Sequence, residues 1–302
     1  MADLVVALFG PTASGKSAVA EAVAERIPAE LVSADAMQVY RGLPILTNQP
    51  DFPTRLVAIW ELDQEASVGD YQPLAHAAVD EILAAGNLPV VVGGTGLYLR
   101  TALSGLQLPP PPSPRARERF ERLYDRLGPQ RAHAALADRD PPAAARIHPN
   151  DRRRVVRGLE LAEAGSSLAP QIDRLWSEDT RRPTIVFGLE VPREELDGRI
   201  ERRTRAMFER GVVEEARRAL AGPLSVTARG VLGLREAAEL PTEEAIEQIA
   251  QRTKRYAAYQ RKWMRRLPGL VSLPAGRSPA EIADEIVEMA RARQRLPARR
   301  AG

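Results

Sequence analysis

Residues 10–17 read Gly-Pro-Thr-Ala-Ser-Gly-Lys-Ser, which has the spacing of a phosphate-binding loop. In such a loop the glycines let the backbone curl until its N–H groups point at phosphate oxygens, and the following helix start favours negative charge. Lys16 would reach a terminal phosphate, and the Ser17 hydroxyl would ligate Mg²⁺. An apolar run at 4–9 and a helix-like segment at 18–26 supply the strand and helix that the loop requires. The motif predicts a phosphate site and leaves open whether the phosphates belong to a nucleotide.

Asp35 is an acidic residue that follows a short strand-like segment at 30–33. It could cap the next helix, hold Mg²⁺ or accept a proton from a nucleophile. In a nucleotide kinase the Mg²⁺-binding Asp usually ends a more hydrophobic strand than Leu-Val-Ser-Ala at 31–34. We therefore favour a role for Asp35 as a base or in substrate contact.

A second glycine-rich turn, Gly-Gly-Thr-Gly at 93–96, follows the apolar segment 89–92. Its backbone N–H groups and the Thr95 hydroxyl could bind an anion or a metal. Tight packing between a strand and a helix would also select these glycines. Because the turn accompanies a phosphate loop, we favour the functional interpretation.

Arginines are concentrated at the start of a predicted helix near residue 152, with Asn150 or Asp151 as its N-cap. Arg153, Arg154 and Arg157 share one face of this helix because they are three or four residues apart. A solvated face usually mixes in Glu or Lys, whereas guanidinium groups bind phosphates bidentately. The cluster indicates contact with a polyanion.

Aromatic residues and cations alternate at helical spacing in residues 252–266. Tyr256, Tyr259 and Trp263 form one stripe, and packing of this stripe on the core is at least as good an explanation as ligand contact. The cations of the segment would then add to a basic surface.

The elements that must position these residues alternate between strand and helix. Apolar strand-like segments occur at 4–9, 30–33, 56–60, 89–92 and 184–189, and most are separated by helical segments. This rhythm predicts an α/β fold, a doubly wound parallel sheet like that of the P-loop NTPases. Ligands of such sheets bind at the carboxyl ends of the strands, so Lys16, Asp35 and Thr95 are expected to converge on one pocket.

A run of prolines at 109–112 interrupts this pattern. Residues 115–178 are helical in character, and residues 113–182 hold 15 Arg against 11 Asp and Glu. We predict an inserted all-helical subdomain at 113–182 whose basic surface could bind a polyanion, within a P-loop catalytic domain formed by 1–112 and 183–302. After residue 190 the sequence predicts helices to the end, at 193–210, 212–221, 231–240, 242–266 and 278–293.

Composition excludes several classes of protein. With no cysteine among 302 residues the chain has no disulfide, thiolate nucleophile or cysteine-based zinc site, and three histidines argue against any structural zinc. No apolar run approaches the roughly 20 residues of a membrane helix, and no basic n-region of a secretory signal is present. We expect a cytoplasmic enzyme, a monomer without a membrane partner.

Together these motifs resemble the tRNA dimethylallyltransferases (tRNA isopentenyltransferases) of the IPP transferase family. The matching segments keep the family's order over nearly the whole chain. They are GPTASGKS at 10–17, SADAMQVYRG at 33–42, SVGDYQ at 67–72, GGTGLY at 93–98, IHPNDRRRVVRGLEL at 147–161 and YAAYQRKWMRR at 256–266.

The resemblance implies a reaction. The loop would bind the diphosphate of dimethylallyl diphosphate rather than ATP, with Mg²⁺ as cofactor neutralising the leaving diphosphate. The acceptor would be the N6 amine of the adenosine 3′-adjacent to the anticodon, in tRNAs reading codons that start with U, flipped out of the anticodon stem-loop into the core. By match to the family motifs, Asp35 would take the amine proton, Thr95 would contact substrate and metal, and Lys16 would complete the catalytic set.

The resemblance also implies binding residues. Ser17 and Thr95 would hold the metal. The expected diphosphate contacts are Gly10, Thr12, Ala13, Ser14, Gly15, Lys16 and Ser17, with Arg229 and Arg235 as candidates for a further contact. The expected tRNA contacts are Asp35, Ala36, Met37, Gln38, Thr95, Arg117, Arg153, Arg154, Val155, Val156 and Arg157.

Three alternatives stay open on the residues alone. A relative that prenylates free adenylate would share the core and the loop, but the basic insert and the arginine cluster favour tRNA. A P-loop kinase for a small metabolite would need an ATP lid and a second carboxylate. A non-catalytic RNA-binding protein would leave the intact loop unexplained.

Overall fold

The structure is a computed structural model that describes residues 3–111, 113–169 and 174–295. The chain divides into two compact units, one formed by 1–105 with 175–302 and the other by 106–174. Residues 1–2, 112 and 296–302 of the expected catalytic domain, and 170–173 of the expected insert, lie outside the described residues.

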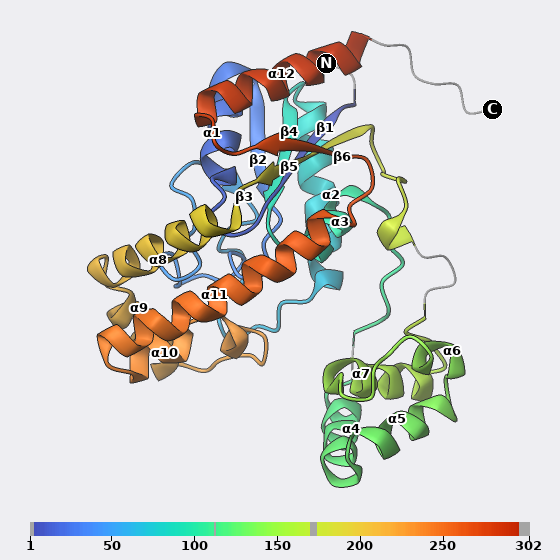
Figure 1. Ribbon diagram of the computed structural model, residues 1–302. Coiled ribbons are helices and arrows are strands. Elements are labelled where there is room, and N and C mark those ends of the chain that lie inside the picture. The colour runs from blue at the N-terminus through green and yellow to red at the C-terminus, as the bar shows by residue number, and fades with distance from the viewer. Residues whose placement is uncertain (1–2, 112, 170–173, 296–302) are drawn as a thin grey trace, which may run out of the picture. The chain divides into compact units, whose positions relative to one another are not determined.

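The first unit is built on a six-stranded sheet in the order β3-β2-β4-β1-β5-β6, with all neighbours parallel. The central strands are almost entirely buried, which explains why they are apolar without polar alternation. The strands are β1 (Val5–Phe9), β2 (Ala29–Ser33), β3 (Thr54–Arg55), β4 (Leu88–Gly93), β5 (Thr184–Glu190) and β6 (Leu270–Pro274). Figure 1 shows them at the centre of this unit.

Both faces of the sheet are covered by helices, because alternate residues of each strand enter different cores. On β1, Val5 and Phe9 pack in a core with α2 (Val68–Ala84) and α3 (Gly96–Leu103). Val6 and Leu8 pack in the opposite core with α1 (Lys16–Arg26) and α12 (Pro279–Arg295). The predicted α/β fold, a doubly wound parallel sheet, is confirmed.

The remaining helices of this unit follow β5. They are α8 (Arg193–Glu209), α9 (Val212–Ala221), α10 (Leu234–Glu239) and the 23-residue α11 (Thr242–Met264), with the 3₁₀ turn η2 (Ala228–Gly230). A further 3₁₀ turn, η1 (Arg174–Trp176), precedes β5, where the chain passes from one unit to the other. Helix α11 packs along α8 and also contacts α3, so it reaches from one side of the strand ends to the other. No helix in the described part of the chain is long and apolar enough to cross a membrane.

Two strands differ from the sequence prediction. The strand expected at 56–60 does not form, because Leu56 and Ala58 have positive φ values of 63° and 52° that an extended strand cannot contain. Only the short β3 and an isolated bridge between Tyr40 and Trp60 remain. The edge strand β6 was not predicted at all.

The second unit consists of α4 (Pro114–Leu127), α5 (Pro129–Ala137), α6 (Pro141–Ala144) and α7 (Arg152–Glu163). These helices share their own apolar core, which includes Phe120, Leu136 and Leu159. The unit spans 106–174, so it begins and ends before the expected limits of 113 and 182. Residues 177–182 go with the first unit because hydrogen bonds tie them there: Arg100 donates to Ser177 O at 2.9 Å, and Arg181 pairs with Asp80.

Candidate functional site

The phosphate loop lies between β1 and α1, as its sequence requires. Ala13 and Gly15 have φ values of 63° and 92°, so the backbone turns back on itself before α1 begins at Lys16. A Cβ atom on Gly10 would lie 2.6 Å from Ser14 Oγ, which shows how tightly the loop is wound. Within the described residues, the buried Ser14 hydroxyl and the Ser17 hydroxyl have no hydrogen-bond partner. The loop thus presents a helix start and two unengaged hydroxyls.

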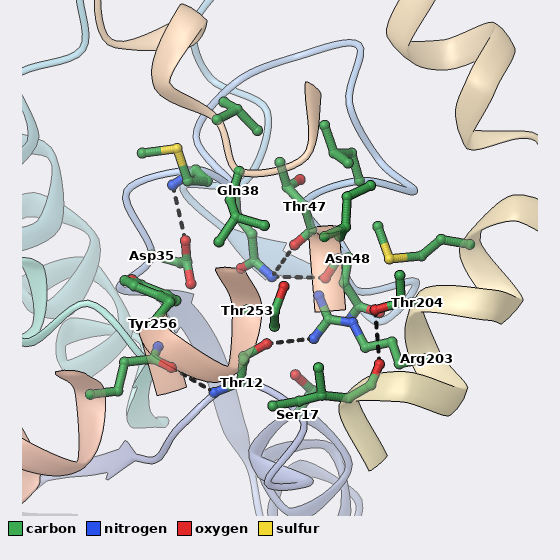
Figure 2. Close-up of a pocket in the computed structure, with 18 of the residues that line it drawn as sticks. Thr12, Ser17, Asp35, Gln38, Thr47, Asn48, Arg203, Thr204, Thr253 and Tyr256 are labelled. Atoms are coloured by element: carbon green, nitrogen blue, oxygen red, sulfur yellow. Dashed lines mark hydrogen bonds between the residues drawn. The ribbon is translucent and has the colours of Figure 1, made fainter. Parts of the chain in front are cut away.

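A cavity opens beside this loop and brings together residues from many parts of the first unit (Figure 2). Lys16, Ser17 and Thr12 line its phosphate-loop side, and Asp35 is the only carboxylate among the lining residues. The rest of the wall comes from the turn after β2, the loop near residue 47, the segment between η2 and α10, and the helices α8 and α11. These further residues are Met37, Gln38, Leu46, Thr47, Asn48, Ile200, Arg203, Thr204, Met207, Val231, Leu232, Ile249, Thr253, Tyr256 and Gln260.

Lys16 is the central cation of the cavity. Loss of hydration lowers its pKa to about 8, Asp35 acts to raise the pKa, and the nearby charge of Arg203 lowers it further. The ammonium group forms no hydrogen bond or ion pair with the residues that the structure describes. A charge in this position is ready for an anionic ligand.

Three arginines from α8 reach the same loop. The Arg203 guanidinium donates to Thr12 Oγ1 at 2.7 Å, and Arg199 donates to Ser14 O at 3.3 Å. Together with Arg202 they line a second, adjoining cavity on the outer side of Lys16 and Ser17. Burial lowers the pKa of Arg203, whose guanidinium nevertheless remains charged at neutral pH.

These α8 arginines replace the expected pair, Arg229 and Arg235, at the loop. Both expected residues are exposed and line neither of the two cavities. The physical reason is the course of the chain, since α8 follows β5 directly and packs beside the loop, whereas η2 and α10 carry the other two arginines outward. The spacing of Arg199, Arg202 and Arg203 on one face of a predicted helix was the signal that could have indicated them.

Asp35 faces the cavity from the end of β2 (Figure 2). Its Oδ1 accepts a hydrogen bond from the Met37 N–H at 2.9 Å, which fixes the carboxylate in a tight turn. Oδ2 has no hydrogen-bond partner within the described part of the chain. Asp35 can therefore accept a proton from a group placed in the cavity.

Thr95 and Tyr256 form a small polar group close to Asp35. The Thr95 hydroxyl accepts a hydrogen bond from the Ala36 N–H at 3.2 Å and lies 3.3 Å from the Tyr256 hydroxyl. Burial and the charge of Asp35 raise the pKa of Tyr256, so the phenol stays protonated. Thr95 and Ala36 are not among the lining residues of the cavity, whereas Tyr256 is. The aromatic stripe of α11 thus contributes one member, Tyr256, to the site.

The Gln38 amide is engaged by the protein itself. It accepts a hydrogen bond from Ser33 Oγ at 2.8 Å. It also donates to Asn48 O at 2.8 Å, as Figure 2 shows. The buried Glu215 carboxylate of α9 accepts from the N–H groups of Ile45 and Leu46 at 2.9 and 2.7 Å. These bonds hold the loop at 45–48 as a fixed wall of the cavity.

The rest of the cavity wall is largely apolar. The side chains that make up this part belong to Met37, Leu46, Ile200, Met207, Val231, Leu232 and Ile249. One cavity therefore combines a cationic end at the phosphate loop, a carboxylate at the end of β2 and an apolar wall. This combination suits a ligand with an anionic head and a short hydrocarbon chain.

In the helical unit, the residues expected to bind RNA fall into two groups. Arg153 and Arg154 are exposed at the start of α7, and the described residues offer Arg153 no ion-pair partner. Arg117 and Arg157 instead donate to the buried Glu160 carboxylate, each at 3.0 Å. Their guanidinium groups serve the unit's own structure.

Val155 and Val156 require a correction. Their side chains are 0% and 3% exposed and belong to the core of the helical unit, so they cannot contact a ligand at its surface. The helical periodicity of α7 explains this, since the two valines lie on the face opposite Arg153 and Arg154.

The fold and the cavity define a P-loop α/β protein in which a phosphate loop lies beside a largely apolar cavity wall. A family model described as IPP transferase matches residues 38–267. The tRNA dimethylallyltransferases of Kineococcus radiotolerans and Thermobifida fusca are 39% and 40% identical to this chain, with coverage of 94% and 89% of it and 96% and 89% of their own lengths. The crystal structure of the full-length tRNA isopentenylpyrophosphate transferase from Bacillus halodurans is 30% identical, with a TM-score of 0.69 over 97% of this chain and 99% of that one. The chain belongs to the IPP transferase family.

The lowered pKa of Lys16 leads to a first prediction. A bound diphosphate raises the pKa of Lys16 again, so binding of inorganic pyrophosphate at pH 8 should be accompanied by uptake of about half a proton at this residue. Affinity should fall as pH rises above about 8. Calorimetry in two buffers with different ionisation enthalpies measures the uptake.

The control variants are Lys16→Met, which should lack this share of the uptake, and Lys262→Met, an exposed lysine of α11 that should behave as the unmodified protein. Equal proton uptake by the unmodified protein and Lys16→Met would show that Lys16 is not the group that titrates.

Proposed function

We propose that this protein transfers a dimethylallyl group from dimethylallyl diphosphate to the N6 amine of the adenosine 3′-adjacent to the anticodon of tRNA, with release of diphosphate. The observation that carries the proposal is the single cavity in which Lys16, Arg203 and Asp35 meet an apolar wall. The reaction needs cations for the leaving group, an apolar space for the five-carbon chain and a base for the amine.

The bonding changes follow from this arrangement. The bond between the allylic carbon and the diphosphate oxygen breaks, and its electron pair leaves with the diphosphate. The amine nitrogen forms the new bond to that carbon, and its proton passes to Asp35. Lys16 and the α8 arginines stabilise the negative charge that develops on the leaving oxygens, an effect that is largest where water is excluded.

The residues present also fit Mg²⁺. The Ser17 hydroxyl is directed at the phosphate site and unengaged, and Mg²⁺ is commonly held by one or two protein oxygens together with phosphate oxygens and water. When bound, the ion would neutralise charge on the diphosphate. Thr95, the second expected ligand, has its hydroxyl hydrogen-bonded to Ala36 and Tyr256, so we assign it to the acceptor side of the site.

The names of the relatives and the exposed arginines of α7 support tRNA as the acceptor. We further propose that the protein acts as a monomer in the cytoplasm, where its tRNA substrate is present.

The test of the acceptor is direct. The protein is incubated with labelled dimethylallyl diphosphate, Mg²⁺ and either unmodified tRNA or AMP. We expect label in tRNA, located at the adenosine beside the anticodon, and little in AMP. Transfer to AMP alone would make the protein an adenylate prenyltransferase, and hydrolysis of ATP without any transfer would make it a kinase-like enzyme.

Asp35→Asn tests the base. Asparagine keeps the acceptor for the Met37 N–H but cannot take a proton, so turnover should fall by about 10²- to 10⁴-fold while tRNA binding is retained. The matched control is Asp63→Asn, which changes an exposed carboxylate and should leave turnover unchanged. Normal turnover by the Asp35→Asn variant would show that Asp35 does not act as the base.

The double substitution Arg153→Ala and Arg154→Ala tests the RNA surface. Loss of two phosphate contacts should weaken tRNA binding and reduce the slope of log affinity against log salt concentration by about 1 to 2. Arg157→Ala is the contrasting variant. It removes a partner of the buried Glu160, so its main effect should be on hydrogen-exchange protection of 114–163. An unchanged salt slope in the double variant would place the RNA elsewhere.

A further inference from the structure

Gln260 connects two loops that the sheet itself leaves unconnected. Its side-chain oxygen Oε1 accepts a hydrogen bond from the Thr12 N–H at 2.8 Å, and its nitrogen Nε2 donates to Gly94 O at 2.8 Å. Gln260 is 2% exposed and comes from α11, about 250 residues along the chain from Thr12. Both hydrogen bonds therefore lie in an environment where an unpaired partner is costly.

The two loops follow neighbouring strands. β1 and β4 are parallel and paired as far as Phe9 and Gly93, and the sheet pairing stops there. Beyond that point the phosphate loop continues from β1, and the Gly94–Thr95 turn continues from β4. Thr12 and Gly94 are held relative to one another by a single side chain that bonds to both.

Glycines next to this contact leave room for it, because any side chain at these positions would overlap α11. A Cβ atom on Gly94 would lie 2.2 Å from Gln260 Nε2, and one on Gly96 would lie 2.1 Å from Trp263. Helix α11 therefore packs directly against the backbone of the turn, through Gln260 and Trp263. The glycine-rich turn at 93–96 serves close approach of this helix.

The partners of these loops differ in chemistry. On one side the Thr12 hydroxyl accepts from Arg203, within the cationic group around the phosphate loop. On the other side Thr95 is bonded to Ala36, next to Asp35. Gln260 thus joins the end of the site that would hold the leaving diphosphate to the end that would hold the acceptor amine.

We propose that Gln260 is a positioning residue that fixes the distance between the diphosphate half and the acceptor half of the site. The inference rests on the proposed function, because those two halves are defined by the proposed reaction. A shift of about 1 Å between reacting groups can cost on the order of 10²-fold in rate. Each half would still bind its own ligand, because Gln260 presents no free polar atom to either.

The test separates positioning from binding. Gln260→Met keeps the length and packing of the side chain but breaks both hydrogen bonds. We expect kcat to fall about 10- to 100-fold. The dissociation constants of inorganic pyrophosphate and of tRNA, measured separately, should change less than about threefold. Gln251→Met, at an exposed position of the same helix, is the matched control and should leave kcat unchanged.

Gln260→Leu provides a second variant should Gln260→Met fail to fold. Leucine also forms neither hydrogen bond and adds no charge to the cavity, so kcat should again fall with both affinities kept. Normal kcat in either folded variant overturns the proposal. A parallel loss of pyrophosphate affinity also overturns it, since Gln260 would then act through diphosphate binding alone. Prenyl transfer by the unmodified protein is measured first, so a failure of the proposed function is seen before any variant is compared.

Discussion

The site depends on positive charge held in a partly desolvated cavity with little compensation. Lys16 and Arg203 line a cavity that contains one carboxylate, Asp35, and burial lowers the pKa of both cations. Charges in such an environment cost free energy in the empty protein and recover it when a polyanion binds. The same arrangement stabilises a diphosphate best when its negative charge is greatest, which is when its bond to the allylic carbon breaks. The electrostatic strain of the cavity and the proposed catalysis therefore have one cause.

The parallel sheet makes this arrangement possible, and α8 and α11 complete it. Because β1, β2 and β4 are parallel, their carboxyl ends bring Lys16, Asp35 and Thr95 to the same edge of the sheet. That edge alone would leave the loops open to water and free to move apart. α8 adds the arginines and apolar side chains, and α11 adds Tyr256 and the bridge through Gln260. Residues late in the chain thus set the geometry of motifs that come first.

The sequence predicted the parts of the molecule that are encoded locally. The phosphate loop is eight consecutive residues, and buried parallel strands such as β4 are continuous apolar runs, so both were identified correctly. The arginines of α8 share one face of a predicted helix, but in a chain so rich in arginine only the packing of that helix decides that this face reaches the loop. The prediction of a strand at 56–60 was wrong because Leu56 and Ala58 have positive φ. Neither residue type favours positive φ, so this conformation comes from the loop's contacts with the rest of the fold. Val155 and Val156 were grouped with their arginine neighbours, although helical periodicity places them in the core.

The apolar wall has a consequence for the proposed chemistry beyond holding the prenyl chain. Departure of an allylic diphosphate leaves positive charge on carbon, and water would capture that carbon as readily as an aromatic amine does. Side chains such as Met207, Val231 and Ile249 offer a water molecule no hydrogen bond, and the two hydroxyls beside them, those of Thr204 and Thr253, are not bases that could activate one. Asp35 is the one carboxylate among the lining residues, and it lies on the side of the site proposed for the amine. The cavity thus favours transfer over hydrolysis by its distribution of polar groups, with one carboxylate and a group of cations beside a largely apolar wall.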